Sequence, residues 1–110
     1  MIFKIPEKFL WALQRLSALF LLTFFIWFVI SIYNVELQSY SETLKWIKTD
    51  YNSLLLFLFS ITIVLHANLG LSVIIEDYVH TSNYKKFFYF LKSILVLFCM
   101  LFSGICLYFI

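Results

Sequence analysis

The sequence predicts an all-α membrane protein with three transmembrane helices, and two observations carry that prediction. Of the 110 residues, 64% are hydrophobic and only 13% are charged, and the mean hydropathy is +0.97, a composition unlike that of soluble domains. Three apolar stretches, residues 16–35, 52–75 and 87–110, each reach the length of about 20 residues that a helix needs to cross a hydrocarbon core. Helices are expected because backbone groups in lipid must find hydrogen bonds within the chain.

The three spans and their connections follow in order along a single domain, 1–110. The stretch 16–35 has neither proline nor glycine to interrupt it, and without an obvious small-residue cleavage site it is expected to remain in the mature chain. A loop is expected over residues 34–50. The stretch 52–75 contains Gly70, and the stretch 87–110 contains Gly104 and, near its start, Lys92. A short link around residues 76–86 joins the second and third spans.

The basic residues are distributed unequally between the two ends of the predicted helices. Six lie before the first span or around the link to the third span, and two lie in the first loop: Lys4, Lys8, Arg15, Lys85, Lys86 and Lys92, against Lys45 and Lys48. Cytoplasmic loops retain positive charge. We therefore expect the amino terminus and the 76–86 link on the cytoplasmic or matrix side of the membrane.

The composition also excludes several kinds of chemistry. Two glycines do not make a phosphate-binding loop, and the net charge of +2 is explained by topology rather than by nucleic-acid binding. Cys99 and Cys106 would lie about 10.5 Å apart along a helix axis, too far to bond to each other, and two thiolates do not hold an iron–sulfur cluster. Any chemistry therefore requires a bound cofactor or a partner chain.

His66 is the ionisable residue that stands out, because it lies deep in the second predicted span. A neutral histidine there can hydrogen-bond a neighbouring helix, or it can serve as a functional group with a protein-side partner. On a helix Gly70 falls one turn from His66, and Asp77 falls within about 20° of the same face. Gly70 allows either close helix packing or the approach of a flat macrocycle. If His66 ligates haem iron, a second imidazole must come from another chain, because His80 is about 21 Å away along the helix.

Asp77 and Tyr78 are expected at the membrane boundary, about 16 to 18 Å from His66 along the helix. A tyrosine at this level is ordinarily an aromatic anchor. Beside an aspartate that orients it, the Tyr78 phenol is also a candidate donor to the carbonyl oxygen of a quinone. Both interpretations stay open on these residues alone.

The combined pattern resembles the membrane-anchor subunit of succinate dehydrogenase, the smaller D-type chain. The matching residues are His66, Gly70 and the pair Asp77-Tyr78, with the element Arg15-Leu16-Ser17-Ala18 at the entrance to the first span. The three-span layout and the length are also similar to that family. The resemblance implies half of a heterodimeric helical-bundle anchor, in which a second three-helix cytochrome b subunit supplies the other half.

The resemblance also implies the cofactors, partners and residue roles. His66 is expected to be an axial ligand of the iron of haem b, which is shared with the second subunit. Tyr78 is expected to bind ubiquinone, with Asp77 as electrostatic support, although Glu76 is a second acid beside it. Arg15 is expected near a haem propionate or the quinone region, or is simply a basic anchor at the boundary. The chain would hold a flavoprotein subunit and an iron–sulfur subunit that oxidise succinate, while itself contributing only to quinone reduction.

Two other functions remain open on the sequence. A homo-oligomeric b-type cytochrome would use His66 from two copies of the chain, and a small proton-coupled transporter would use His66 as a relay. The expected location is a bacterial cytoplasmic membrane or the mitochondrial inner membrane, in contact with lipid.

Overall fold

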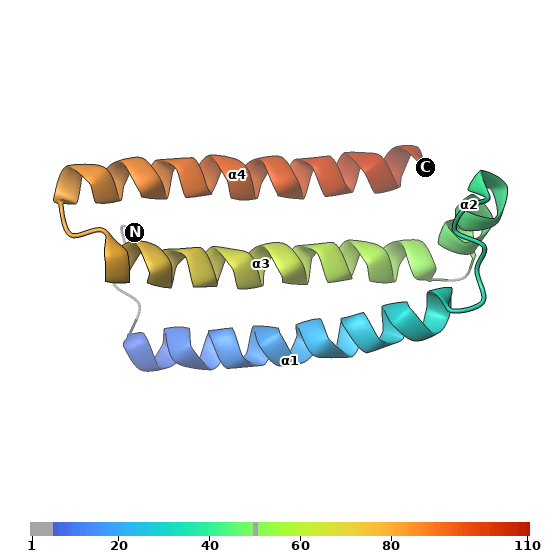
Figure 1. The fold of residues 1–110 in the computed structure, drawn as a ribbon, viewed down its shortest axis with the longest axis horizontal. Coiled ribbons are helices and arrows are strands. Elements are labelled where there is room, and N and C mark those ends of the chain that lie inside the picture. The colour runs from blue at the N-terminus through green and yellow to red at the C-terminus, as the bar shows by residue number, and fades with distance from the viewer. Residues whose placement is uncertain (1–5, 50) are drawn as a thin grey trace.

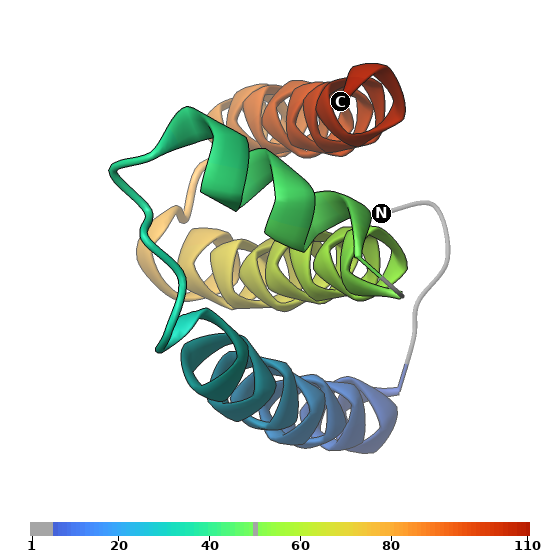
Figure 2. The ribbon, with the colours of Figure 1, turned by 90° about the vertical axis from the view of Figure 1, so that its right-hand side faces the viewer.

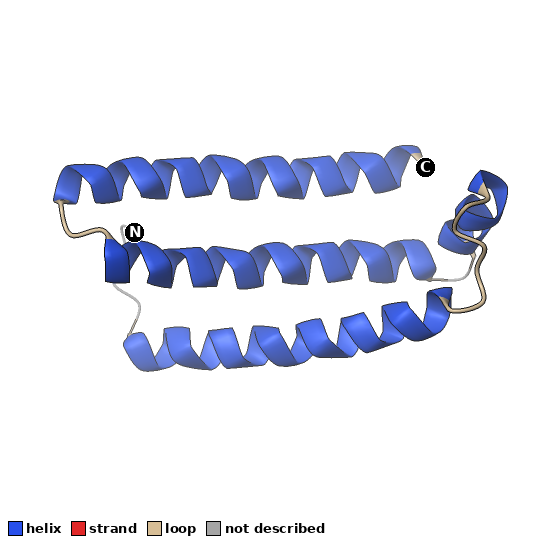
Figure 3. Cartoon of the chain, in the orientation of Figure 1, coloured by secondary structure: helices blue, strands red, loops and turns tan. Residues whose placement is uncertain are grey.

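The computed structural model describes residues 6–49 and 51–110, which form four helices and no strand. The helices are α1 (Glu7–Ile32), α2 (Tyr40–Lys48), α3 (Asn52–Tyr78) and α4 (Ser82–Phe109). Figures 1 and 3 show the long helices α1, α3 and α4 side by side, each running in the opposite direction to the one before it, with the short α2 at one end. The predicted all-α fold is confirmed, and α1, α3 and α4 are long and apolar enough to cross a membrane.

Helix α3 is the central element. Both α1 and α4 pack against it, but the described parts of α1 and α4 do not pack against each other, as the end-on view in Figure 2 illustrates. The α1–α3 contact is aromatic: the Phe59 ring lies 6.0 Å from that of Phe24 and 5.7 Å from that of Phe28, between centroids. Such pairs contribute beyond their buried area, so they fix which face of α1 meets α3.

Helix α2 corrects the prediction of a loop over residues 34–50. Its N-cap Ser39 accepts a hydrogen bond from the backbone N–H of Glu42, a capping arrangement that satisfies an otherwise unpaired donor. Trp46 packs near the rings of Trp27 and Phe28, at 6.1 Å in both cases. An isolated helix of 9 residues is only marginally stable in water, so α2 depends on its packing against the ends of the long helices. The predicted loop end at residue 50 lies outside the described residues.

The long helices also differ from the predicted spans at their ends: α1 ends at Ile32 rather than at residue 35, while other ends lie further out than predicted. Helix α1 begins at Glu7 rather than at residue 16, and α4 begins at Ser82 rather than at residue 87. Hydropathy reports only the part of a helix that suits lipid, whereas backbone hydrogen bonding continues the helix into water. The predicted link therefore shortens to residues 79–81. Lys4, which contributed to the predicted orientation, lies outside the described residues.

Very little of the chain is shielded from its surroundings. Among the described residues only Ile75 is buried, with 7% of its surface exposed, while large apolar side chains on every long helix are open. Soluble monomers do not expose apolar surface on this scale. The chain is therefore a multi-pass membrane protein, with apolar surface for lipid and for other subunits. Cys99 and Cys106 are both free, as predicted.

Candidate functional site

His66 lies in the middle of α3 and contacts α1. Its Nδ1 is 2.8 Å from the hydroxyl oxygen of Ser17, and both side chains are partly buried. Within the described part of the chain, Nε2 has no hydrogen-bond partner. The imidazole is therefore held by one nitrogen, and the other is available to a group from outside this chain.

Gly70 lies one turn from His66, on a nearly common face of α3. A Cβ built on Gly70 meets no other atom within 4 Å, whereas one on Gly104 would meet the Phe57 ring at 3.7 Å. Close packing within this chain thus accounts for Gly104 but not for Gly70. The surface beside Gly70 is open to a partner helix or a flat ligand.

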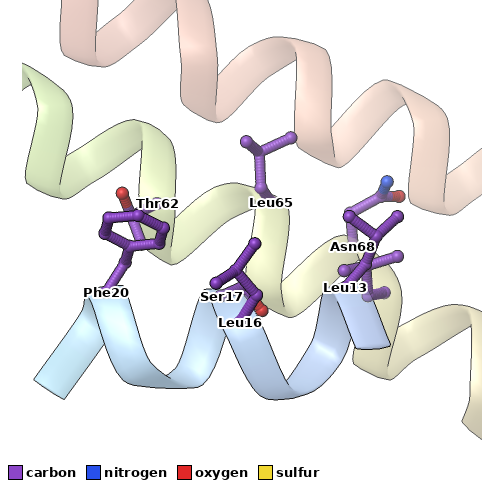
Figure 4. Close-up of a pocket in the computed structure, with 8 residues that line it drawn as sticks. Leu13, Leu16, Ser17, Phe20, Thr62, Leu65 and Asn68 are labelled. Carbon is purple, nitrogen blue, oxygen red and sulfur yellow. The ribbon is translucent and has the colours of Figure 1, made fainter. Parts of the chain in front are cut away.

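An apolar groove of about 270 Å³ runs between α1 and α3 next to the His66–Ser17 contact. In Figure 4 the Phe20 side chain extends from α1 toward α3, whereas Leu65 points away from α1. Ser17 lines the groove and also contacts His66. The groove is surface that lipid or another subunit would cover in the membrane.

Asp77 and Tyr78 form the last turn of α3, and both are exposed. Tyr78 has 79% of its surface open, and within the described residues neither side chain makes a hydrogen bond or ion pair. Asp77 shares the His66 face, whereas Tyr78 is rotated by about 100° from Asp77. Both polar groups are available to partners beyond this chain.

Glu76, the neighbouring acid, is engaged by α4. Its carboxylate accepts hydrogen bonds from the Tyr89 hydroxyl at 2.6 Å and from Lys85 Nζ at 3.1 Å, the latter being an ion pair. Sequence adjacency left Glu76 and Asp77 as equal candidates for the quinone-support role. The contacts of Glu76 with α4 leave Asp77 as the carboxylate on the open side of α3.

Lys92 forms a polar contact between α3 and α4 that sequence reasoning did not assign. Its Nζ donates to the Ser72 hydroxyl at 2.9 Å and lies 4.9 Å from the centre of the Tyr89 ring. The sequence feature that could have revealed this contact is Lys92 itself, a single cation inside an apolar stretch, because a charged group in lipid requires a partner. Lys92 thus has a structural role in holding the α3–α4 pair.

Arg15 is exposed on α1, and its guanidinium lies 5.3 Å from the centre of the Trp11 ring. The start of α1 and the end of α3 lie at the same end of the molecule (Figure 1). Arg15 lies two residues from Ser17, which contacts His66, so it is nearer to the level of His66 than to that of Asp77 and Tyr78, and no described contact joins it to either of them.

The described residues do not form a complete metal site of their own, because His66 and His80 lie on and beyond α3, fourteen residues apart. The described part of the chain contains no group of three or more histidine, cysteine or acidic side chains that could hold an ion. A haem iron suits this arrangement, because the macrocycle provides most of the ligands and the protein needs to supply only axial ones. The available Nε2 of His66 and the open surface at Gly70 fit such a group at an interface with another chain.

The fold and the site define a multi-pass membrane subunit that offers one histidine and a tyrosine to groups outside itself. The family model described as succinate dehydrogenase/fumarate reductase transmembrane subunit matches residues 4–109. The chain belongs to that family, and the recognition made from the His66, Gly70 and Asp77-Tyr78 pattern is confirmed.

A relative gives the same indication over a shorter range. A protein of Porphyra purpurea, named succinate dehydrogenase membrane anchor subunit, is 54% identical over 44 residues, which are 39% of this chain and 46% of the relative. The chain thus matches less than half the length of that relative. No solved structure matches the chain.

Proposed function

We propose that this chain is the membrane anchor of a succinate:ubiquinone oxidoreductase, complex II of respiratory electron transport and the tricarboxylic acid cycle. It would form half of a heterodimeric bundle with a second three-helix cytochrome b subunit. The iron–sulfur and flavoprotein subunits would dock on the end that carries Tyr78, and succinate would be oxidised on them. The observation that carries the proposal is the His66 imidazole in a chain of this family, tethered by Nδ1 and available at Nε2.

His66 is the proposed axial ligand to a haem b shared with the second subunit. When bound, haem accepts and releases one electron. This chain's contribution would be to orient the imidazole through the contact of its Nδ1 with Ser17. A second imidazole would have to come from the partner, because His80 lies beyond the end of α3, fourteen residues from His66. The open surface at Gly70 supports this placement.

Tyr78 is the proposed donor to ubiquinone. Its phenol would donate a hydrogen bond to a quinone carbonyl oxygen, and that bond strengthens as negative charge develops during reduction. Asp77 would orient the phenol or pair with a basic group of the second subunit. Arg15, two residues from the serine that contacts His66, would lie near the quinone or a haem propionate and stabilise negative charge there.

The proposed location is a bacterial cytoplasmic membrane or the mitochondrial inner membrane, with the amino terminus inside. Lys8, Lys85 and Lys86 lie at the end of the bundle that carries Tyr78, while Lys45 and Lys48 lie on α2 at the other end. This asymmetry supports the orientation through the positive-inside rule. The catalytic subunits would then face the cytoplasm or matrix, where succinate is available.

Purification tests the proposed assembly. The tagged chain, solubilised gently from its native membrane, should bring with it a second small membrane subunit and two soluble subunits that contain flavin and iron–sulfur clusters. Recovery of the chain with copies of itself alone would favour the homo-oligomeric cytochrome. Recovery alone and without haem, together with transport that His66→Ala abolishes, would favour the proton-coupled transporter. Either result would contradict the proposed function.

A further inference from the structure

We infer that Ser17 is a positioning residue that holds His66 as the tautomer with its proton on Nδ1. The tautomer follows from the contacts of Ser17, and its use in binding haem rests on the proposed function. Ser17 makes two contacts: its hydroxyl oxygen is 3.0 Å from the backbone carbonyl oxygen of Gln14 and 2.8 Å from His66 Nδ1. The question is which atom donates in each.

The proton count decides the answer. A serine hydroxyl has one hydrogen to donate and two lone pairs with which to accept, whereas a carbonyl oxygen only accepts. The Ser17–Gln14 contact is a hydrogen bond only if the Ser17 hydroxyl donates. That hydroxyl then has no hydrogen left for His66, so the contact with Nδ1 is a hydrogen bond only if Nδ1–H donates to the Ser17 oxygen.

The state of the other ring nitrogen follows directly. In a neutral imidazole one nitrogen carries hydrogen and the other carries a lone pair. With hydrogen on Nδ1, the lone pair is on Nε2, the nitrogen without a partner among the described residues. A lone pair is what a metal ligand requires. The hydrogen bond to Ser17 therefore keeps the lone pair on Nε2 even without bound iron. Hydrogen-bonded neighbours of ligating histidines fix the tautomer in the same way in other metal sites.

The surroundings strengthen the restraint. Ser17 and His66 meet between two helices in the apolar part of the membrane protein, where water does not compete for the hydrogen bond. Ser17 lies on α1 and His66 on α3, so the bond also fixes the imidazole relative to a second helix. Ser17 thus sets both the tautomer and the orientation of the His66 ring.

Nitrogen-15 spectroscopy of the histidine ring tests the tautomer without any haem. The full chain, labelled in histidine and reconstituted into lipid bilayers, would carry His80→Gln so that His66 is the one histidine left. At alkaline pH, where imidazole is neutral, the ring should be protonated on Nδ1. Ser17→Ala should produce a mixed population, and Ser17→Thr, which keeps the hydroxyl, should restore Nδ1–H. A proton on Nε2 with Ser17 present, or identical spectra for Ser17 and Ser17→Ala, would overturn the inference.

The purified complex tests the consequence for haem. Ser17→Ala should weaken haem retention by about 10- to 100-fold, the usual cost of losing such a neighbour, while Ser17→Thr should behave like the unsubstituted complex. Alanine favours helix, so α1 should persist. Equal haem retention in all three would overturn the role in ligation. A complex with the Nδ1–H tautomer but no haem would contradict the proposed haem site and leave the tautomer assignment intact, so the two failures are distinguishable.

Discussion

Replacement of Tyr78 by phenylalanine is expected to lower succinate:quinone reductase activity by about 10²-fold, the lower end of what a positioned proton donor contributes. The ring remains, so the shape of the site is preserved and only the phenolic hydroxyl is lost. Tyr78 is highly exposed, and no described contact depends on its hydroxyl. The substitution should therefore leave the fold intact. The rate with an artificial acceptor, which takes electrons before the quinone site, should not change.

The matched control is Tyr108→Phe, which removes a phenol from the opposite end of the molecule. Tyr108 is also exposed, and it lies near the end of α4, where the carboxyl terminus is seen in Figure 1. This variant should reduce quinone at the normal rate. Normal quinone reductase activity in Tyr78→Phe, measured over a range of quinone concentrations, would show that the hydroxyl has no part in the reaction.

Replacement of Gly70 by leucine is expected to lower the haem b content of the purified complex and to weaken the association of this chain with the second small subunit. Within this chain the new side chain meets open space, so the fold of the three helices should survive. At the proposed interface it would occupy the surface on which the haem and partner dock. Overpacking of this kind costs about 1 to 3 kcal/mol, enough to reduce haem content by about tenfold.

Cys99→Leu provides the control for added apolar bulk in a span. Cys99 is exposed on α4, the helix that packs against the other side of α3 from the His66–Ser17 contact. Haem content should be normal in this variant, as measured by the ratio of haem to flavin. Normal haem and normal recovery of the partner in Gly70→Leu would mean that the surface beside Gly70 faces lipid.

The three membrane spans could be predicted from the sequence, because the hydropathy and the length of each stretch depend only on the residues within that stretch. Helix α2 was not predicted, because its nine residues are too few to show a helical period. Its stabilising contacts, those of Trp46 with Trp27 and Phe28, join residues far apart in the sequence. Helix ends were also misplaced, because lipid preference ends before backbone hydrogen bonding does.

In the candidate site, too, features within one helix could be predicted from the sequence, whereas contacts between helices could not. The common face of His66 and Gly70 follows from helix geometry alone, whereas the structure was needed to show that no atom of this chain lies within 4 Å of a Cβ built on Gly70. The contact between His66 and Ser17 could not be predicted from spacing, because it depends on the rotation of α1 set by the Phe24 and Phe59 rings. The difference between Glu76 and Asp77 likewise appears only once α4 is placed.

The role of His66 as a haem ligand is tested most directly by a reduced-minus-oxidised optical spectrum of the purified assembly. Unsubstituted protein should show a b-type haem signal, and His66→Ala should lose it, because the remaining histidine, His80, lies beyond the end of α3. His80→Ala should retain the signal and serve as the control. A b-type signal that persists unchanged in His66→Ala would contradict the account.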